Sequence, residues 1–147
     1  MIDTSLKISL LDTLKRIQDE FGVAYLYITH DLALGRYFAQ EQRLAVMYLG
    51  QIIETGPTEA VISAPKHPYT RALISAGDME ERVEYDLIGV EIPSFHEIPR
   101  GCPLSPRCPE AMKGICYSVE PELLPTSPDR AVACHLYSGP REKNGVR

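Results

Sequence analysis

The chain has 147 residues, 44% of them hydrophobic, which is enough for one small domain with a modest buried core. Its formal net charge of −5 argues against a nucleic-acid-binding surface, because such a surface needs a basic patch. The apolar runs are far shorter than the roughly 20 residues that cross a bilayer, and no basic stretch leads into an apolar one at the amino end. We therefore expect a globular, cytoplasmic protein.

The first elements predicted along the chain are a helix, a buried strand and a second helix. Residues 3–21 carry apolar side chains at spacings of three and four, which predicts an amphipathic helix that Gly22 ends. Residues 23–29, "VAYLYIT", form an almost unbroken apolar and aromatic run of the kind found in buried parallel strands. Asp31 can cap a short helix that runs to about Gln40.

A hairpin and two short helices are predicted next. The segment "RLAVMYLGQIIETG" has two β-rich runs around Gly50 and Gln51, which indicate an antiparallel hairpin. Thr58 can cap a helix over "EAVIS", which Pro65 stops. A second helix is predicted over "PYTRALISA", because proline suits the first helical turn, where Pro68 stands.

The composition of the chain changes after these helices. Residues 77–91 are rich in Asp and Glu and predict an exposed acidic connector. Residues 92–137 hold eight of the twelve prolines and all four cysteines, which predicts a loop-rich module, and residues 138–147 are predicted to be a flexible tail. We therefore expect an α/β fold over residues 1–76, with a core strand, a hairpin and short helices, followed by a small cysteine module.

The four cysteines leave three chemistries open. They are Cys102, Cys108, Cys116 and Cys134, separated by five, seven and seventeen residues. Structural zinc sites usually contain cysteine pairs separated by two to four residues, and this sequence has no such pair. A zinc site is therefore less favoured, but it stays open as an interpretation. An iron-sulfur cluster tolerates irregular spacing, and disulfides are disfavoured in a reducing cytosol. His135, next to Cys134, is a candidate substitute ligand, although a solvent-facing neighbour is the simpler interpretation.

Several stretches together resemble the C-terminal part of an ABC transporter ATPase subunit. They are "FGVAYLYITHDLAL", "VMYLGQIIETGPTEAVI" and "PKHPYTRALISA". "HPYTRALISA" followed by "GCPLSPRCPEA" and "VACH" is similar to the oligopeptide and dipeptide (peptide/nickel-type) importer branch. The resemblance covers nearly the whole chain. It implies the end of an ABC-type P-loop nucleotide-binding domain over residues 1–76 and the peptide-importer extension over residues 92–137.

The resemblance also implies roles for individual residues. His30 would be the switch histidine, which contacts the terminal phosphate of ATP and helps to hold the attacking water in line. Asp3 would be the D-loop aspartate at the interface with the partner subunit, and its simpler interpretation is a helix N-cap. Some members of the importer branch carry a [4Fe-4S] cluster in this tail, which makes the four cysteines candidate ligands, with zinc or disulfides as alternatives. Leu104 and Ser105 stand where an aromatic residue and a histidine are common in the family.

Other family motifs do not occur in the 147 residues. There is no G-x-x-x-x-G-K-[ST] motif, no LSGGQ-like signature, no Q-loop and no Walker B strand. These motifs lie upstream of the D-loop in the family, so we expect a fragment, either a deliberately prepared piece or a reading frame begun at an internal methionine, that does not hydrolyse ATP by itself.

The complete subunit is expected to bind ATP and Mg and to couple hydrolysis to peptide import. It would lie peripherally on the inner face of the cell membrane, against permease subunits and a second ATPase subunit. The alternatives are a stand-alone iron-sulfur or zinc module and a non-catalytic interaction or regulatory fragment. The transported substrate, the oligomeric state and the group held by the cysteines stay open.

Overall fold

The structure is a computed structural model, which describes residues 3–77, 85–89 and 98–138. The expected acidic connector (77–91) and flexible tail (138–147) lie largely outside these ranges, so both stay predictions. Within the described part of the chain, no helix is both long enough and apolar enough to cross a membrane.

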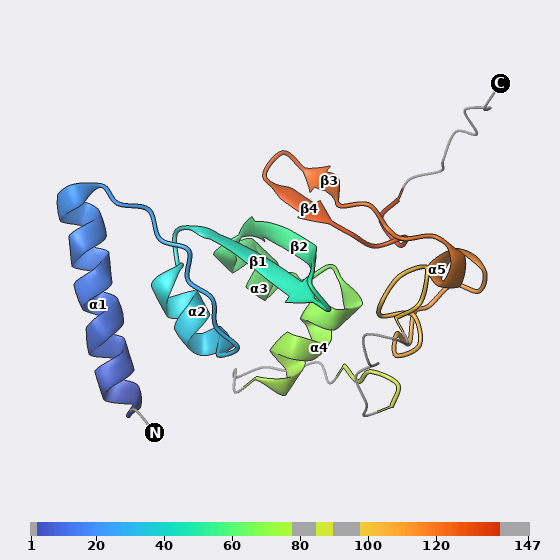
Figure 1. Ribbon diagram of the computed structural model, residues 1–147, viewed down its shortest axis with the longest axis horizontal. Coiled ribbons are helices and arrows are strands. Elements are labelled where there is room, and N and C mark those ends of the chain that lie inside the picture. Colours follow the sequence, from blue (N-terminus) through green and yellow to red (C-terminus); the bar gives the residue numbers. More distant parts are fainter. Residues whose placement is uncertain (1–2, 78–84, 90–97, 139–147) are drawn as a thin grey trace.

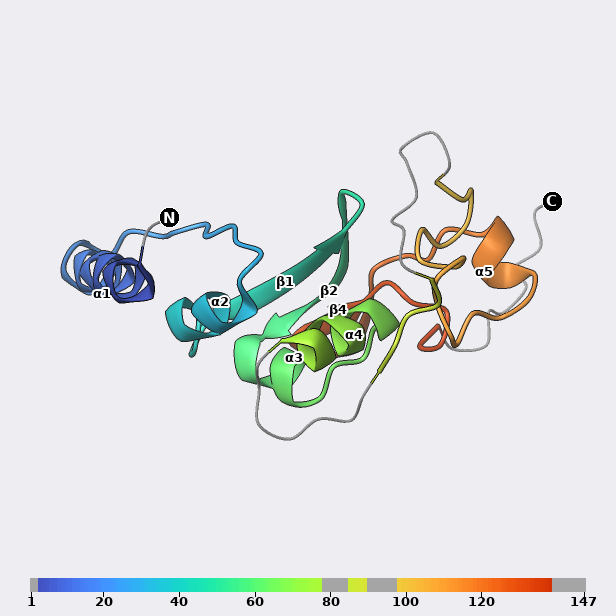
Figure 2. The same ribbon diagram turned by 90° about the horizontal axis from the view of Figure 1, so that it is seen from below.

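Helices and strands are arranged along an elongated molecule (Figure 1). In chain order they are α1 (Thr4–Phe21), α2 (Leu32–Phe38), β1 (Arg43–Tyr48), β2 (Gln51–Pro57), α3 (Thr58–Ser63), α4 (Pro68–Ala76), α5 (Ile115–Ser118), β3 (Leu124–Ser127) and β4 (Arg130–Val132). Helix α1 lies at one end of the molecule and α5 at the other, with the sheet between them, and Figure 2 shows the same order from below. The mixture of helices and sheet is compatible with the predicted α/β class.

Helix α1 begins and ends close to the predicted positions. Gly22 follows it with φ 65° and ψ 24°, the left-handed conformation that glycine adopts without steric cost, and its N–H donates to the Gln18 carbonyl at 2.8 Å. The prediction that Gly22 ends this helix is therefore confirmed. Asp3 occupies the N-cap position, but its side chain makes no capping hydrogen bond.

The predicted core strand over residues 23–29 is wrong in this structure. The segment connects α1 to α2 without forming a strand, and Leu26 and Ile28 are 89% and 82% exposed. A buried parallel strand needs neighbouring strands to satisfy its backbone groups. In the described residues the four strands form one antiparallel sheet, and this segment pairs with none of them.

Helix α2 is capped as predicted, because the Asp31 carboxylate accepts a hydrogen bond from the Leu34 N–H at 3.0 Å. The helix ends at Phe38, close to the predicted end at Gln40. Leu34 and Phe38 pack with Leu11 of α1 in a small cluster of their own, separate from the main core. This cluster attaches α1 to the rest of the molecule.

Strands β1 and β2 form the predicted hairpin, with a turn that lies one residue earlier than the Gly50–Gln51 pair. Leu49 and Gly50 are the turn residues, with φ angles of 45° and 81°. Two successive positive φ angles are typical of a type I′ turn, whose twist matches that of the flanking strands. Glycine adopts this conformation freely, whereas leucine rarely does.

Helices α3 and α4 follow the hairpin. Pro68 occupies the first turn of α4 as predicted, and the ring Nδ1 of His67 accepts the Tyr69 N–H at 3.0 Å as an N-cap. Thr58, predicted to cap α3, is instead its first residue, and its hydroxyl donates to the Gln42 carbonyl at 3.2 Å. The predicted cap is therefore wrong, because this hydroxyl is used to anchor the helix to the segment before β1.

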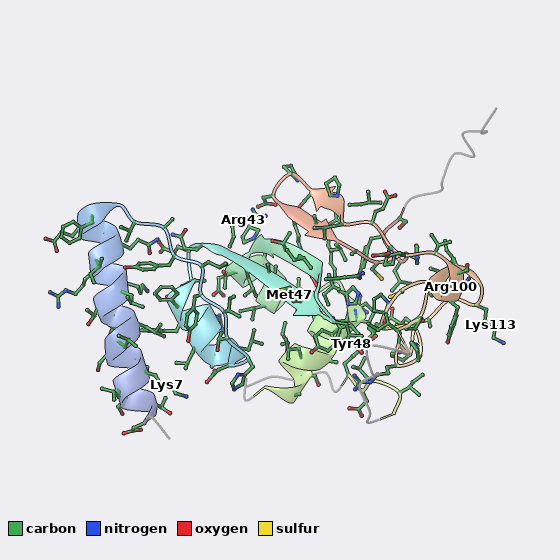
Figure 3. All side chains as sticks on the ribbon, in the orientation of Figure 1. Lys7, Arg43, Met47, Tyr48, Arg100 and Lys113 are labelled. Atoms are coloured by element: carbon green, nitrogen blue, oxygen red, sulfur yellow. The ribbon has the colours of Figure 1, made fainter. Side chains whose placement is uncertain are left out.

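The sheet joins the hairpin to the cysteine-containing part of the chain. Its order is β1-β2-β4-β3 with antiparallel neighbours, and Glu54 of β2 lies opposite Val132 of β4. Arg43, at the start of β1, donates to the Asp129 carbonyl in the β3–β4 turn at 3.0 Å, and Tyr48, at its end, points toward the cysteine loops (Figure 3). The main core contains Val46, Tyr48, Ile53, Val61, Cys102, Leu104 and Cys116. Hairpin and cysteine loops therefore share one core.

Candidate functional site

The predicted switch histidine, His30, and the predicted D-loop aspartate, Asp3, lie on exposed parts of the chain near α2 and α1. His30 is exposed at the end of the connecting segment, directly before Asp31. The backbone there is held by a hydrogen bond from the Asp31 N–H to Thr29 Oγ1 at 3.0 Å. Asp3 is exposed immediately before α1. Both side chains are accessible to a ligand or partner, and their roles stay predictions.

The four predicted cysteines, in contrast, converge. Cys102, Cys108, Cys116 and Cys134 all line one small cavity, together with His67, Ser105 and His135. All four are free thiols. Across the described residues, no three His, Cys, Asp or Glu side chains are arranged to hold a single metal ion. The cavity is therefore lined by thiols from loops that are far apart in the sequence, but the thiols do not surround a single metal-binding point.

One sulfur accepts a hydrogen bond from the backbone, because the Met112 N–H donates to Cys116 Sγ at 3.4 Å. For the other three thiols, hydrogen bonding by a backbone N–H two residues further along the chain acts to lower the pKa. These N–H groups belong to Leu104 for Cys102, Glu110 for Cys108 and Leu136 for Cys134. Such N–H···S hydrogen bonds stabilise thiolates, and they help to set the reduction potential of iron-sulfur centres.

Burial and these hydrogen bonds have opposite effects on the pKa of the thiols. It raises the pKa of Cys108 to about 11 and the pKa of Cys134 to about 12, and the charges of the neighbouring thiols add to the effect. Burial also raises the pKa of Cys102. These three thiols are therefore protonated at neutral pH, so a metal that binds them must displace their protons.

A close backbone contact brings two of the cysteines to the same wall. The Cys102 N–H donates to the Cys116 carbonyl at 2.8 Å. Gly101 precedes this contact, and a Cβ atom at that position would lie 2.4 Å from the Cys116 oxygen. The two loop segments can approach so closely only if this residue has no side chain, which explains why residue 101 is glycine.

Two histidines outside the predicted set of four ligands also line the cavity. His67, at the N-cap of α4, is 1% exposed, and burial lowers its pKa to about 4. His135, expected to face solvent, is 5% exposed, and this expectation is wrong. A turn closed by the Tyr137 N–H and the Cys134 carbonyl, at 3.0 Å, keeps the ring inside, where its Nε2 lies 2.8 Å from the Val119 carbonyl oxygen. The one signal in the sequence was the position of His135 next to a cysteine.

Comparison with known proteins agrees with the expected family. Residues 53–116 match the family model described as "Oligopeptide/dipeptide transporter, C-terminal region". The match includes His67 and three of the cysteines and ends at Cys116, so Cys134 and His135 lie beyond it.

Curated relatives extend this similarity over most of the chain. The chain is 46% identical over 137 residues to a putative peptide import ATP-binding protein of Brucella abortus, which covers 92% of the chain and 40% of the relative. It is 38% identical over 151 residues to the putative oligopeptide transport ATP-binding protein YkfD of Bacillus subtilis, covering 99% and 45%. It is 38% identical over 139 residues to the dipeptide transport ATP-binding protein DppF of Haemophilus influenzae, covering 90% and 41%.

The chain thus spans less than half the length of these relatives. The similarity nevertheless includes both the segments before the hairpin and the region that the family model describes. By these matches the chain belongs to the family of ATP-binding subunits of oligopeptide and dipeptide ABC transporters, and it carries the C-terminal region of that family.

Proposed function

We propose that the chain is part of an ATP-binding subunit that couples ATP hydrolysis to peptide import by an ABC transporter. The observation that carries this proposal is the 46% identity, over 92% of the chain, to a peptide import ATP-binding protein. The complete subunit binds ATP and Mg, pairs with a second ATPase subunit and docks onto permease subunits. It therefore works in the cytoplasm, on the inner face of the cell membrane.

Within that subunit, His30 contacts the terminal phosphate and orients the attacking water, and Asp3 faces the partner ATPase subunit. The exposure of both side chains supports these roles, because neither is committed to the interior of the molecule. The Asp31 cap of α2 fixes the backbone directly after His30, which helps to position the ring. The 147 residues contain no G-x-x-x-x-G-K-[ST] motif, so the chain alone does not hydrolyse ATP.

A chimera tests this proposal. The chain replaces the aligned 139 residues of the Haemophilus influenzae dipeptide transport ATP-binding protein, and dipeptide uptake is measured in a strain that lacks the native protein. The chimera should restore ATP-dependent uptake, and His30→Ala should lower its ATPase rate by roughly 100-fold, the effect of losing one contact to developing charge. Glu41→Ala, an exposed change just beyond α2, is the control and should leave the rate unchanged.

Three results would count against the proposal or against part of it. A folded chimera that is made in normal amounts but supports no uptake rejects the peptide-import role. A His30→Ala chimera with full ATPase activity rejects the role of His30 alone. If the chain binds the permease subunits without nucleotide while the chimera stays inactive, a non-catalytic interaction role replaces the ATPase role.

A second proposal concerns the cysteine cavity, which we infer to hold a [4Fe-4S] cluster through Cys102, Cys108, Cys116 and Cys134. This proposal is supported by the four free thiols that line one cavity and by the Met112 N–H, which donates to the Cys116 sulfur. A tetrahedral zinc site needs all its sulfurs within about 3.8 Å of one another, since each Zn–S distance is about 2.3 Å. In the described part of the chain no three His, Cys, Asp or Glu side chains are arranged to hold a metal ion, and a cluster would bind each cysteine to a separate iron.

When bound, the cluster would supply one-electron redox chemistry or cross-link a loop-rich region that buries little apolar surface. The test is anaerobic reconstitution with iron and sulfide, followed by iron and sulfide analysis and a visible spectrum. We expect about four irons per chain and a broad absorption that bleaches on reduction, and loss of both in Cys108→Ser. Stoichiometric zinc without iron would instead identify a zinc module.

A further inference from the structure

The segment that leads to His30 lies against α2 (Figure 1). The Tyr27 ring packs edge-on against the Phe38 ring, with 5.1 Å between the ring centroids. Thr29 lies beside Gly35, where an added Cβ atom would be 3.4 Å from Thr29 Cγ2. The segment therefore runs in the direction opposite to α2, and the chain bends at His30 before it enters the helix.

A side-chain hydrogen bond closes this bend. The Asp31 N–H donates to Thr29 Oγ1 at 3.0 Å, so the ring of atoms that this bond completes contains the backbone of His30. Threonine hydroxyls stabilise turns in this way, by accepting from the backbone two residues further on. Because the ring is small, the bond restricts the φ and ψ angles of His30. These angles set the direction in which its side chain leaves the backbone.

The residue after His30 is anchored to α2. The Asp31 carboxylate accepts the Leu34 N–H at 3.0 Å, and the Asp31 carbonyl accepts the Gly35 N–H at 3.0 Å. Leu34 in turn packs in the buried cluster that joins α1 to α2. Asp31 is therefore a fixed point, and the Thr29 hydroxyl connects the two sides of His30 through it.

We propose that Thr29 is a positioning residue for His30, whose hydroxyl holds the histidine backbone in the bend that presents the ring to the terminal phosphate of ATP. This inference rests on the switch role proposed for His30 and adds to it a residue that fixes its orientation. Placement matters in phosphoryl transfer, because a group displaced by about 1 Å can lower the rate roughly 100-fold. His30 is exposed, so burial does not fix the direction of its side chain.

The test uses the chimera described above with three substitutions. Thr29→Val keeps the shape of the side chain and removes its hydroxyl, whereas Thr29→Ser keeps the hydroxyl. Thr13→Val is the matched control, because it removes an exposed hydroxyl that donates to the Ser9 carbonyl within α1. Thr29→Val should lower kcat for ATP hydrolysis roughly 10-fold with little change in KM, since it disturbs a contact made in the transition state. Thr29→Ser and Thr13→Val should stay close to the wild-type rate.

Two further measurements separate positioning from a merely structural role. Once His30→Ala has removed the imidazole, Thr29 has nothing to position, so adding Thr29→Val should cause no further loss of rate. In the isolated chain, hydrogen exchange of the Asp31 amide should be faster in Thr29→Val and unchanged in Thr29→Ser, which tests the hydrogen bond without any activity.

The outcomes distinguish this inference from the proposed function. A wild-type rate in Thr29→Val, an equal loss with and without His30, or unchanged exchange of the Asp31 amide overturns the role of Thr29 and leaves that of His30 intact. A rate in Thr29→Ser as low as in Thr29→Val also overturns it, because the hydroxyl would then not be the group responsible. A folded chimera without uptake rejects the proposed function, and the role of Thr29 falls with it.

Discussion

Glu54 and Arg130 form a buried ion pair, with 2.5 Å between the carboxylate oxygen and the guanidinium nitrogen and exposures of 0% and 7%. Glu54 lies on β2 and also accepts the His67 N–H at 2.9 Å, directly before α4. Arg130 lies on β4 and also donates to the Ala60 carbonyl of α3 at 2.9 Å. The pair therefore links the hairpin, two helices and the cysteine-containing part of the chain.

Removing one member of this pair should destabilise the protein strongly. Arg130→Met leaves the Glu54 carboxylate buried without its cation, and we expect a loss of about 3–5 kcal/mol in the free energy of unfolding, measured with urea. The double variant Glu54→Gln/Arg130→Met should lose less than the single one, because no unpaired charge stays buried. Arg36→Met, which breaks an exposed pair with Glu59, is the control and should cost less than about 1 kcal/mol. Equal losses in Arg130→Met and Arg36→Met would contradict this interpretation.

Gly101→Ala should damage the cysteine cavity. The added Cβ would lie 2.4 Å from the Cys116 oxygen and 2.6 Å from the Tyr117 carbonyl carbon, so the two loops must separate and the hydrogen bond between Cys102 and Cys116 is lost. We expect a free energy of unfolding lower by several kcal/mol and much less iron bound after reconstitution. Gly77→Ala, whose Cβ would meet its nearest atom at 3.6 Å, should change neither value noticeably. An unchanged iron content in Gly101→Ala would show that the contact does not shape the site.

The stability of the chain should fall in mild acid because of His67. Burial lowers the pKa of His67 to about 4 from an ordinary value of 6.5, so between these values the unfolded chain binds a proton that the folded chain does not. Stability therefore rises with pH across this window, and the free energy of unfolding loses at most roughly 3 kcal/mol from this group between pH 6.5 and pH 4.

His67→Asn isolates that contribution. The asparagine side chain can still accept the Tyr69 N–H, but it does not titrate, so its urea-measured stability should decline less steeply below pH 6.5 than that of the wild type. Comparing the two proteins cancels the carboxylates that titrate in the same range. A constant difference between the two curves from pH 7 to pH 4.5 would mean that His67 is not the group responsible.

The exposed segment before α2 should promote association of the isolated chain. Leu26 and Ile28 are 89% and 82% exposed, and exposed apolar side chains on a segment that pairs with no strand favour aggregation. The double variant Leu26→Ser/Ile28→Ser should reduce light scattering at a given protein concentration. Its free energy of unfolding should stay within about 1 kcal/mol of the wild type, since neither side chain packs in the core. If light scattering does not fall in the double variant, the association must involve another surface.

Features that depend on neighbouring residues could be predicted from the sequence. Gly22 ends α1, Asp31 caps α2 and Pro68 begins α4, in each case because the hydrogen bonds and steric limits involved act within one helical turn. The hairpin was predicted for the same reason, with its turn displaced by one residue. The prediction of a strand over residues 23–29 was wrong, because an apolar pattern forms a strand only where other strands are available to pair with it.

The sequence by itself determined the family, the short-range structure and the four cysteines as a set of candidate ligands. Tertiary structure decided which other side chains line the same cavity as the cysteines. The pairing of β4 with β2 and the close contact at Gly101 bring together loops that the sequence separates. They also bury His135, whose free Nδ1 is defined by the distant Val119 carbonyl. Spacing along a chain carries no information about such a contact, because a buried lone pair depends on which remote atoms the fold places around it.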